Sequence, residues 1–222
     1  GWSAILCGVW STKHLVTGND FTINDYESFP SLFRHAEEYD PSISTLSICH
    51  WDPINDYIVD TDADVIVNVG ADLEVRNAAV NQLGNYDPHA MFIHFDDVDY
   101  AGHGYGFSPD VTQYMSAIEQ ADTHVGAVLA ALYARPNYTQ EDWIVIVTSD
   151  HGGLGYSHGG NSMEERNVSF IASGPSVTPM LVEKTILEVN PPPVNCLGGD
   201  GTELYFPTNS NVNVLPNEDL DS

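Results

Sequence analysis

Three short glycine-rich segments carry the side chains of this 222-residue chain that are most suited to chemistry. Asp99 and His103 lie in Asp-Tyr-Ala-Gly-His, Asp150 and His151 begin Asp-His-Gly-Gly, and His158 begins His-Gly-Gly. Mixed imidazole and carboxylate ligands suit Zn²⁺ best among the common divalent ions, with Mn²⁺ or Fe²⁺ as alternatives. Together the five residues predict a centre for two divalent ions.

Each segment alone is much less specific. An Asp and a His four positions apart are often only neighbours on a helix surface, and Asp-His-Gly-Gly is also an ordinary turn sequence. The prediction depends on the combination, because the first two segments directly follow apolar runs that are typical of strands. Gly102 would let a turn bring Asp99 and His103 onto one ion, and a glycine-assisted bend would turn Asp150 and His151 into a common cavity.

The elements that must position these residues alternate along the chain. Apolar and β-branched runs predict strands, and apolar residues at helical spacing predict helices. The strands are expected at 42–49, 64–69, 91–95, 143–148 and 168–172, and the helices at 2–10, 31–39 and 72–83, the last closed by Gly84. The run 143–148 is continuously apolar, which predicts a strand buried on both faces of a parallel sheet.

The clearest predicted helix begins at Ser108 and stops near Pro136. Ser108 would cap it, Pro109 fits a first turn, and Asp110 suits the positive end of the helix dipole. Its apolar stripe is formed by Val111, Tyr114, Met115, Ile118, Val125 and Leu129.

This alternation predicts an α/β fold with a mostly parallel sheet between two layers of helices. Ligands of such sheets bind beyond the carboxyl ends of the strands. Asp99, Asp150 and His151 are expected at that edge.

The composition excludes several classes of function. Only six basic residues stand against 32 acidic ones, which gives a formal charge of −26 and disfavours binding to nucleic acid or anionic membranes. The acidic residues are spread along the chain, as on a surface suited to salty water. No apolar stretch is long enough to span a membrane. Cys7 and Cys49 are expected as small apolar core residues.

The motifs resemble those of the alkaline phosphatase superfamily, and most closely its type I phosphodiesterase/nucleotide pyrophosphatase branch. That branch has motifs similar to Asp-x-x-Gly-His-x-x-Gly, Ser-Asp-His-Gly and a later His-Gly, which match residues 99–106, 149–153 and 158–159 here. Residues 1–14 are similar to the stretch that follows the family's nucleophile. The resemblance covers roughly residues 1–180 and implies an alkaline-phosphatase-like three-layer α/β/α fold, incomplete at its start.

The resemblance implies a hydrolase of small-molecule phosphate esters, a phosphodiesterase or phosphomonoesterase, with two zinc ions. Asp99, His103 and His158 would hold one ion, and Asp150 and His151 would hold the other. The family's second ion is also bound by an N-terminal Asp and by the Ser or Thr nucleophile. Neither has a matching position here, so no catalytic residue is assigned and residues 1–222 alone are expected to be nearly inactive. Ser3 is a weaker candidate for the nucleophile, since nothing near it in the sequence supplies a base or a metal contact.

Other functions remain open. A sulfatase or a metal-dependent phosphoglycerate mutase is the nearest enzymatic alternative, although a mutase should have a basic substrate pocket, which six basic residues disfavour. A non-catalytic surface or adhesion protein could also retain the fold. The residues encoded before Gly1 would discriminate, because a non-catalytic relative is expected to lack both the Asp and the nucleophile.

Three regions are expected: a metal hydrolase domain over 1–182, a Pro- and Gly-rich linker over 183–201, and the start of a laminin-G- or concanavalin-like jelly roll over 202–222. Such a neighbour would make the parent protein extracellular or periplasmic.

Four further polar residues lie near the motifs or near the start of the chain. His94 lies within a predicted strand and is expected to be a core histidine or a partner of a metal ligand. Asp97 is a candidate for orienting a ligand, Asp96 for capping a turn, and His14 for packing or a surface position.

Overall fold

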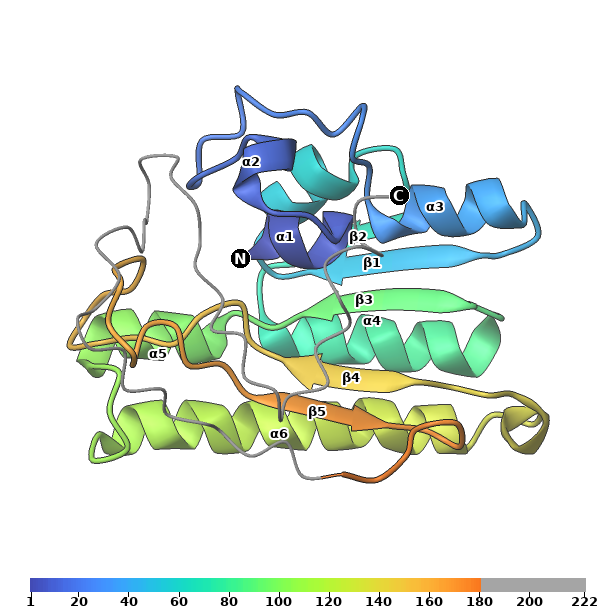
Figure 1. The fold of residues 1–222 in the computed structure, drawn as a ribbon. Coiled ribbons are helices and arrows are strands. Elements are labelled where there is room, and N and C mark those ends of the chain that lie inside the picture. Colours follow the sequence, from blue (N-terminus) through green and yellow to red (C-terminus); the bar gives the residue numbers. More distant parts are fainter. Residues whose placement is uncertain (181–222) are drawn as a thin grey trace.

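A three-stranded parallel sheet forms the centre of the fold in the computed structural model, which describes residues 1–180 (Figure 1). The strand order is β2-β1-β3, with β1 at Thr45–Cys49, β2 at Val65–Asn68 and β3 at Ala90–His94. All five side chains of β1 are buried, as expected of a central parallel strand. The predicted α/β fold is confirmed, and so is each of these three strands.

Helices cover both faces of this sheet, because successive residues of β1 point to opposite sides. Leu46 and Ile48 pack with Val75 and Ala79 of α4 (Asp72–Asn85), and α6 (Thr112–Tyr133) lies beside α4. Cys49 packs on the other side in a cluster with buried residues of α1 (Trp2–Cys7), α3 (Leu32–Tyr39) and the π-helix η1 (Ile54–Val59). The arrangement is the predicted three-layer α/β/α sandwich.

The prediction for the run 143–148 is wrong in two respects. Its strand, β4 (Val145–Thr148), pairs antiparallel with β5 (Phe170–Ser173), and within residues 1–180 it is not hydrogen-bonded to the parallel sheet. The run is also not buried on both faces, since Ile144 is 58% exposed and Ile146 is 56% exposed. The apolar content of the run correctly predicts a strand. The burial of that strand depends on neighbouring elements, which the run itself does not specify.

Several helix boundaries differ from the predictions, and α1 ends at Cys7 rather than at residue 10. Helix α6 begins at Thr112, because Ser108 forms a separate turn in which its Oγ accepts a hydrogen bond from the Asp110 N–H at 3.2 Å. Of the predicted stripe, Ile118 is 37% exposed, while His124 and Leu132 are the buried residues of this helix. The predicted stop before Pro136 is confirmed. Helix α4 continues through Gly84 to Asn85.

The segment 97–105 forms a helix, α5 (Asp97–Tyr105), where a turn was predicted. Helix α2 (Ser11–His14) and the short 3₁₀-helix η2 (Tyr138–Gln140) complete the described elements. Cys7 and Cys49 are buried free thiols, as predicted. No helix within residues 1–180 is long and apolar enough to cross a membrane. The expected linker and jelly-roll start at 183–222 lie outside the described residues.

Candidate metal centre

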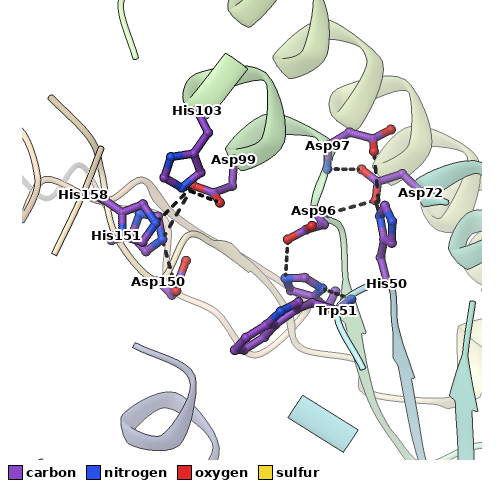
Figure 2. A network of polar contacts seen from close by, with 11 residues as sticks. His50, Trp51, Asp72, Asp96, Asp97, Asp99, His103, Asp150, His151 and His158 are labelled. Carbon is purple, nitrogen blue, oxygen red and sulfur yellow. Dashed lines mark hydrogen bonds and ion pairs between the residues drawn. The ribbon is translucent and has the colours of Figure 1, made fainter. Parts of the chain in front are cut away.

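The structure brings all five predicted ligand residues together (Figure 2). Asp99 and His103 lie on α5, which follows the carboxyl end of β3. Asp150 and His151 follow the carboxyl end of β4, and His158 lies in the loop beyond them. This is the edge at which ligands of α/β sheets bind.

Asp99, His103 and His158 form the tighter group. His103 Nε2 lies 3.4 Å from Asp99 Oδ2, and His158 Nε2 lies 3.6 Å from Asp99 Oδ1. Tetrahedral zinc with ligands at about 2.0–2.1 Å holds them about 3.3 Å apart. The two distances are close to this spacing, and one ligand atom from each of the three side chains lies within 4.8 Å of the others, so they could share an ion after small adjustments.

One oxygen of this group is buried without a hydrogen bond. Asp99 Oδ1 accepts none from any residue in 1–180 and is closed off from solvent. A buried carboxylate oxygen without a partner is costly, and native structures rarely leave one unsatisfied. A cation between Asp99 and the histidines would remove that cost, so the donor set fits a metal ion.

Asp150 and His151 form a second pair beside the first group. His151 Nε2 lies 3.6 Å from Asp150 Oδ2 and 3.9 Å from Asp99 Oδ1, so Asp99 faces both sets. Two side chains are half of a tetrahedral ligand set. The geometry agrees with one nearly complete site beside half of a second, and metal ligation by the five residues stays a prediction.

Two histidines are oriented by backbone carbonyl groups. His103 Nδ1 donates to the Tyr156 carbonyl at 2.9 Å, and His151 Nδ1 donates to the Gly152 carbonyl at 2.8 Å. These bonds place the ring proton on Nδ1 and leave the lone pair of Nε2 directed at the centre, as in known metal sites.

Burial shifts the protonation equilibria of two members in the absence of metal. It raises the pKa of Asp150, and the nearby His151 offsets part of that rise. Burial also lowers the pKa of His158, and the neighbouring His151 lowers it further. A neutral His158 is the form that can bind an ion.

Phe107 is a structural residue of this centre that the sequence reasoning missed. A Cβ added to Gly102 would lie 2.2 Å from the Phe107 ring, and one added to Gly153 would lie 2.3 Å from it. The ring also makes edge contacts with His103 and His158, at centroid distances of 5.4 and 6.2 Å. The glycines of two motifs were the available signal, since a glycine can mark a close approach by another group.

Three of the remaining polar candidates lie apart from the five ligand residues. His94 is a core histidine, 3% exposed, whose Nδ1 accepts a hydrogen bond from the Trp51 N–H at 3.3 Å. Ser3 shares a hydrogen bond of 2.8 Å with the Tyr26 hydroxyl group, and His14 is buried with its Nδ1 bonded to the Val16 N–H. These contacts give all three packing roles.

Asp96 and Asp97 lie where β3 passes into α5. Asp96 occupies the N-cap position of α5, but its side chain makes no capping hydrogen bond. The Asp97 carboxylate lies 3.8 Å from His50 Nδ1, and Figure 2 shows it turned away from Asp99. The geometry therefore gives no support to the prediction that the Asp97 side chain orients a ligand.

The fold and the centre define an α/β domain with candidate ligands for two divalent ions at the carboxyl ends of its strands. A sequence profile of the type I phosphodiesterase / nucleotide pyrophosphatase family matches residues 3–168, which is more than half of the chain. The chain belongs to this family, as its motifs predicted.

Two known proteins are similar to parts of this chain. A 2,3-bisphosphoglycerate-independent phosphoglycerate mutase of Haloquadratum walsbyi is 33% identical over 79 residues, which are 36% of this chain and 14% of the mutase. The solved structure of phosphonoacetate hydrolase from Sinorhizobium meliloti 1021, in complex with phosphonoacetate, has a TM-score of 0.44 and 18% identity, over 67% of this chain and 43% of the hydrolase. This chain therefore spans less than half the length of either protein.

Proposed function

We propose that this chain is the metal-binding part of a hydrolase that cleaves small-molecule phosphate esters with two zinc ions. The observation that carries the proposal is Asp99, whose buried, unbonded Oδ1 faces Nε2 of His151 and of His158, while its Oδ2 faces His103. Membership of the family supports the same reading. Asp99, His103 and His158 would hold one ion, and Asp150 and His151 the other.

Two ions in such a site supply activation of the attacking oxygen and neutralisation of charge on the leaving oxygen. The residues of this chain orient the site: the carbonyl groups of Tyr156 and Gly152 fix the rings of His103 and His151. Phe107 fills the space behind Gly102 and Gly153.

The charge of the chain supports a need for cations at the site. A phosphate ester is an anion, and the chain has a formal charge of −26. Its described arginines donate to other groups: Arg34 to Asp62, Arg76 to Asn77, Arg135 to Glu141 and Arg166 to the Ser162 carbonyl. Metal ions would supply the positive charge that these side chains do not direct at the five ligand residues.

We further propose that the nucleophile and one more carboxylate come from residues that precede Gly1 in the parent protein. The backbone at Gly1 lies against the Asp150 side chain, such that an added Cβ would be 2.5 Å from Asp150 Cβ. A segment that enters there would reach the half-complete second set. By analogy with the family, the nucleophile would come just before that position, and an extracellular or periplasmic location is part of the same proposal.

Zinc binding and ester hydrolysis test the proposal separately. After dialysis against micromolar zinc, residues 1–222 should retain one tightly bound ion, with a second bound much more weakly. The protein extended by its natural upstream residues should hydrolyse p-nitrophenyl phosphate or bis-p-nitrophenyl phosphate, and residues 1–222 alone should be nearly inactive. Absence of bound zinc would refute the metal assignment, and an inactive extended protein that binds two ions would favour a non-catalytic role.

A mutase is a second candidate because of the 33% identity to the phosphoglycerate mutase over 79 residues. Interconversion of 2- and 3-phosphoglycerate by the extended protein, without hydrolysis of nitrophenyl phosphates, would select it. Hydrolysis of nitrophenyl sulfate in preference to the phosphates would select a sulfatase.

A further inference from the structure

Asp72 caps a helix to which it does not belong. It is the first residue of α4 and is 1% exposed, yet its Oδ1 accepts the Asp96 N–H at 2.8 Å and its Oδ2 accepts the Asp97 N–H at 3.1 Å (Figure 2). These N–H groups lie at the start of α5, where a helix has no internal acceptors. The α5 N-cap residue itself makes no side-chain capping bond, so Asp72 takes that role.

His50 holds Asp72 in this position. His50 follows β1, and its Nδ1 lies 2.8 Å from Asp72 Oδ1, the oxygen that also accepts the Asp96 N–H. The His50 backbone N–H donates to the His94 carbonyl at 3.3 Å, at the end of β3. Burial lowers the pKa of His50, but the bond to Asp72 and the nearby carboxylates raise it by more, so the net pKa is raised. The pair joins β1, α4 and the start of α5.

The same residues could be read as another metal site, because ligand atoms of His50, Asp72 and Asp97 lie within 4.8 Å of one another. The hydrogen bonds argue otherwise. Both oxygens of Asp72 already accept backbone N–H groups, and an ion would have to displace those donors or share the oxygens with them. The arrangement is complete as a cap, whereas Asp99 has a buried oxygen without a partner.

The capped helix carries two of the candidate metal ligands. Asp99 lies two residues after Asp97, and His103 lies one turn beyond Asp99 on the same nine-residue helix. A shift of the first turn of α5 would therefore move both side chains relative to His158. Metal sites depend strongly on groups that orient their ligands, and losing one such group typically costs 10- to 100-fold in affinity.

We propose that Asp72, oriented by His50, is a positioning residue of the metal centre: it fixes the start of α5 and thereby the separation of Asp99 and His103 from His158. The inference rests on the proposed metal site, but not on which ester the parent protein cleaves.

The test compares Asp72→Asn with a matched control, Asp62→Asn. Asp62 is 5% exposed, and its Oδ2 accepts the Ser31 N–H at 3.0 Å at the start of α3, while its other oxygen binds Arg34. Both substitutions remove a buried capping carboxylate, but only Asp72 caps the helix that carries ligands. Zinc affinity is measured by competition with a chromophoric chelator, and site geometry by the visible spectrum of the Co²⁺-substituted protein.

Asp72→Asn should weaken the tight zinc site at least tenfold and alter the Co²⁺ spectrum. Asp62→Asn should lower the melting temperature while leaving affinity within twofold of the wild type and the spectrum unchanged. His50→Gln leaves the Asp72 carboxylate in place and should weaken zinc binding a few-fold. This variant replaces Asp72→Asn as the test if Asp72→Asn does not fold.

If Asp72→Asn folds and its zinc affinity is unchanged, the inference is overturned and the proposed function remains intact. If Asp72→Asn does not fold, an unchanged zinc affinity in His50→Gln has the same meaning. An equal affinity loss in Asp62→Asn also overturns it. Loss of one whole zinc ion from His50→Gln would make the cluster a metal site instead. A wild type that binds no zinc would refute both the proposed function and the inference.

Discussion

The imidazole rings of His151 and His158 stack face to face, with centroids 3.7 Å apart and planes 16° apart. Each directs Nε2 towards the same oxygen of Asp99, at 3.9 and 3.6 Å. They nevertheless belong to different proposed ligand sets, because His158 is grouped with His103 and His151 with Asp150. The stack is therefore the boundary between the two halves of the candidate centre.

Replacing the two rings singly should separate the halves. His158→Ala removes one of three ligands from the tight set, and we expect zinc affinity at that site to fall at least 100-fold. His151→Ala leaves that set complete, so the tight ion should bind within about threefold of the wild type while the weaker ion is lost. Isothermal titration with zinc measures both, and equal losses in the two variants would contradict the division.

Gly102 and Gly104 both lie on α5, yet they should respond oppositely to alanine. A Cβ at Gly102 would meet the Phe107 ring at 2.2 Å, whereas nothing lies within 4 Å of one at Gly104. Gly104→Ala should therefore stabilise the protein by up to about 1 kcal/mol, through helix propensity. Gly102→Ala should destabilise it by about 1–3 kcal/mol, as overpacking does.

Urea unfolding of the metal-free protein measures both changes. The double variant Gly102→Ala/Phe107→Ala should lose less unfolding free energy than the sum of the two single losses, because the added methyl group no longer meets the Phe107 ring. Similar effects at both glycines would show that Phe107 does not restrict Gly102.

The sequence was sufficient to predict that five ligand residues would meet, because strand ends gather at one edge of an α/β sheet. It was not sufficient to predict α5. Asp-Tyr-Ala-Gly-His-Gly lacks a helical apolar pattern and has two weak helix formers, so this helix depends on Asp72 at its start and on Phe107 against Gly102. Both partners come from outside the motif, and nothing in the local sequence indicates them.

The pairing of β4 was unpredictable for a related reason. A continuous apolar run indicates a strand but does not specify its partner or its direction. Likewise, the bond between His50 and Asp72 joins residues 22 positions apart that share no motif. Sequence patterns reveal local structure and residue types, while contacts between distant segments decide which faces are covered.

Arg135 joins the ends of α4 and α6 and should tolerate lysine poorly. It is 8% exposed and binds both oxygens of Glu141, at 3.0 and 2.8 Å, as well as Asp87 and the carbonyl groups of Leu83 and Tyr86. A lysine ammonium cannot reproduce this planar set of donors. Arg135→Lys should cost about 2–4 kcal/mol of unfolding free energy in urea titrations.

Arg76→Lys is the matched control, because Arg76 is only partly buried and donates to its neighbour Asn77 at an exposed position. It should change stability by less than about 0.5 kcal/mol. A comparable loss in the two variants would show that the buried contacts of Arg135 add nothing to stability.

His94 should make the fold sensitive to mild acid. Burial lowers the pKa of His94 from 6.5 to about 4; the charge of Asp72 opposes a smaller part of this shift, while His50 adds to it. The unfolded chain therefore binds a proton at pH values where the folded protein leaves this ring neutral. The contribution of His94 to stability is complete above pH 6.5 and is lost as the pH falls towards 4, at up to about 1.4 kcal/mol per pH unit.

His94→Gln isolates this contribution from that of the other titrating groups, since glutamine keeps an acceptor for the Trp51 N–H and does not titrate. The difference in unfolding free energy between wild type and variant, measured in urea from pH 7.5 to 4.5, should shift by about 2–3 kcal/mol against the wild type as the pH falls. A difference independent of pH over that range would mean that His94 titrates alike in the folded and unfolded chain, contrary to its burial against the Trp2 ring and the Trp51 backbone.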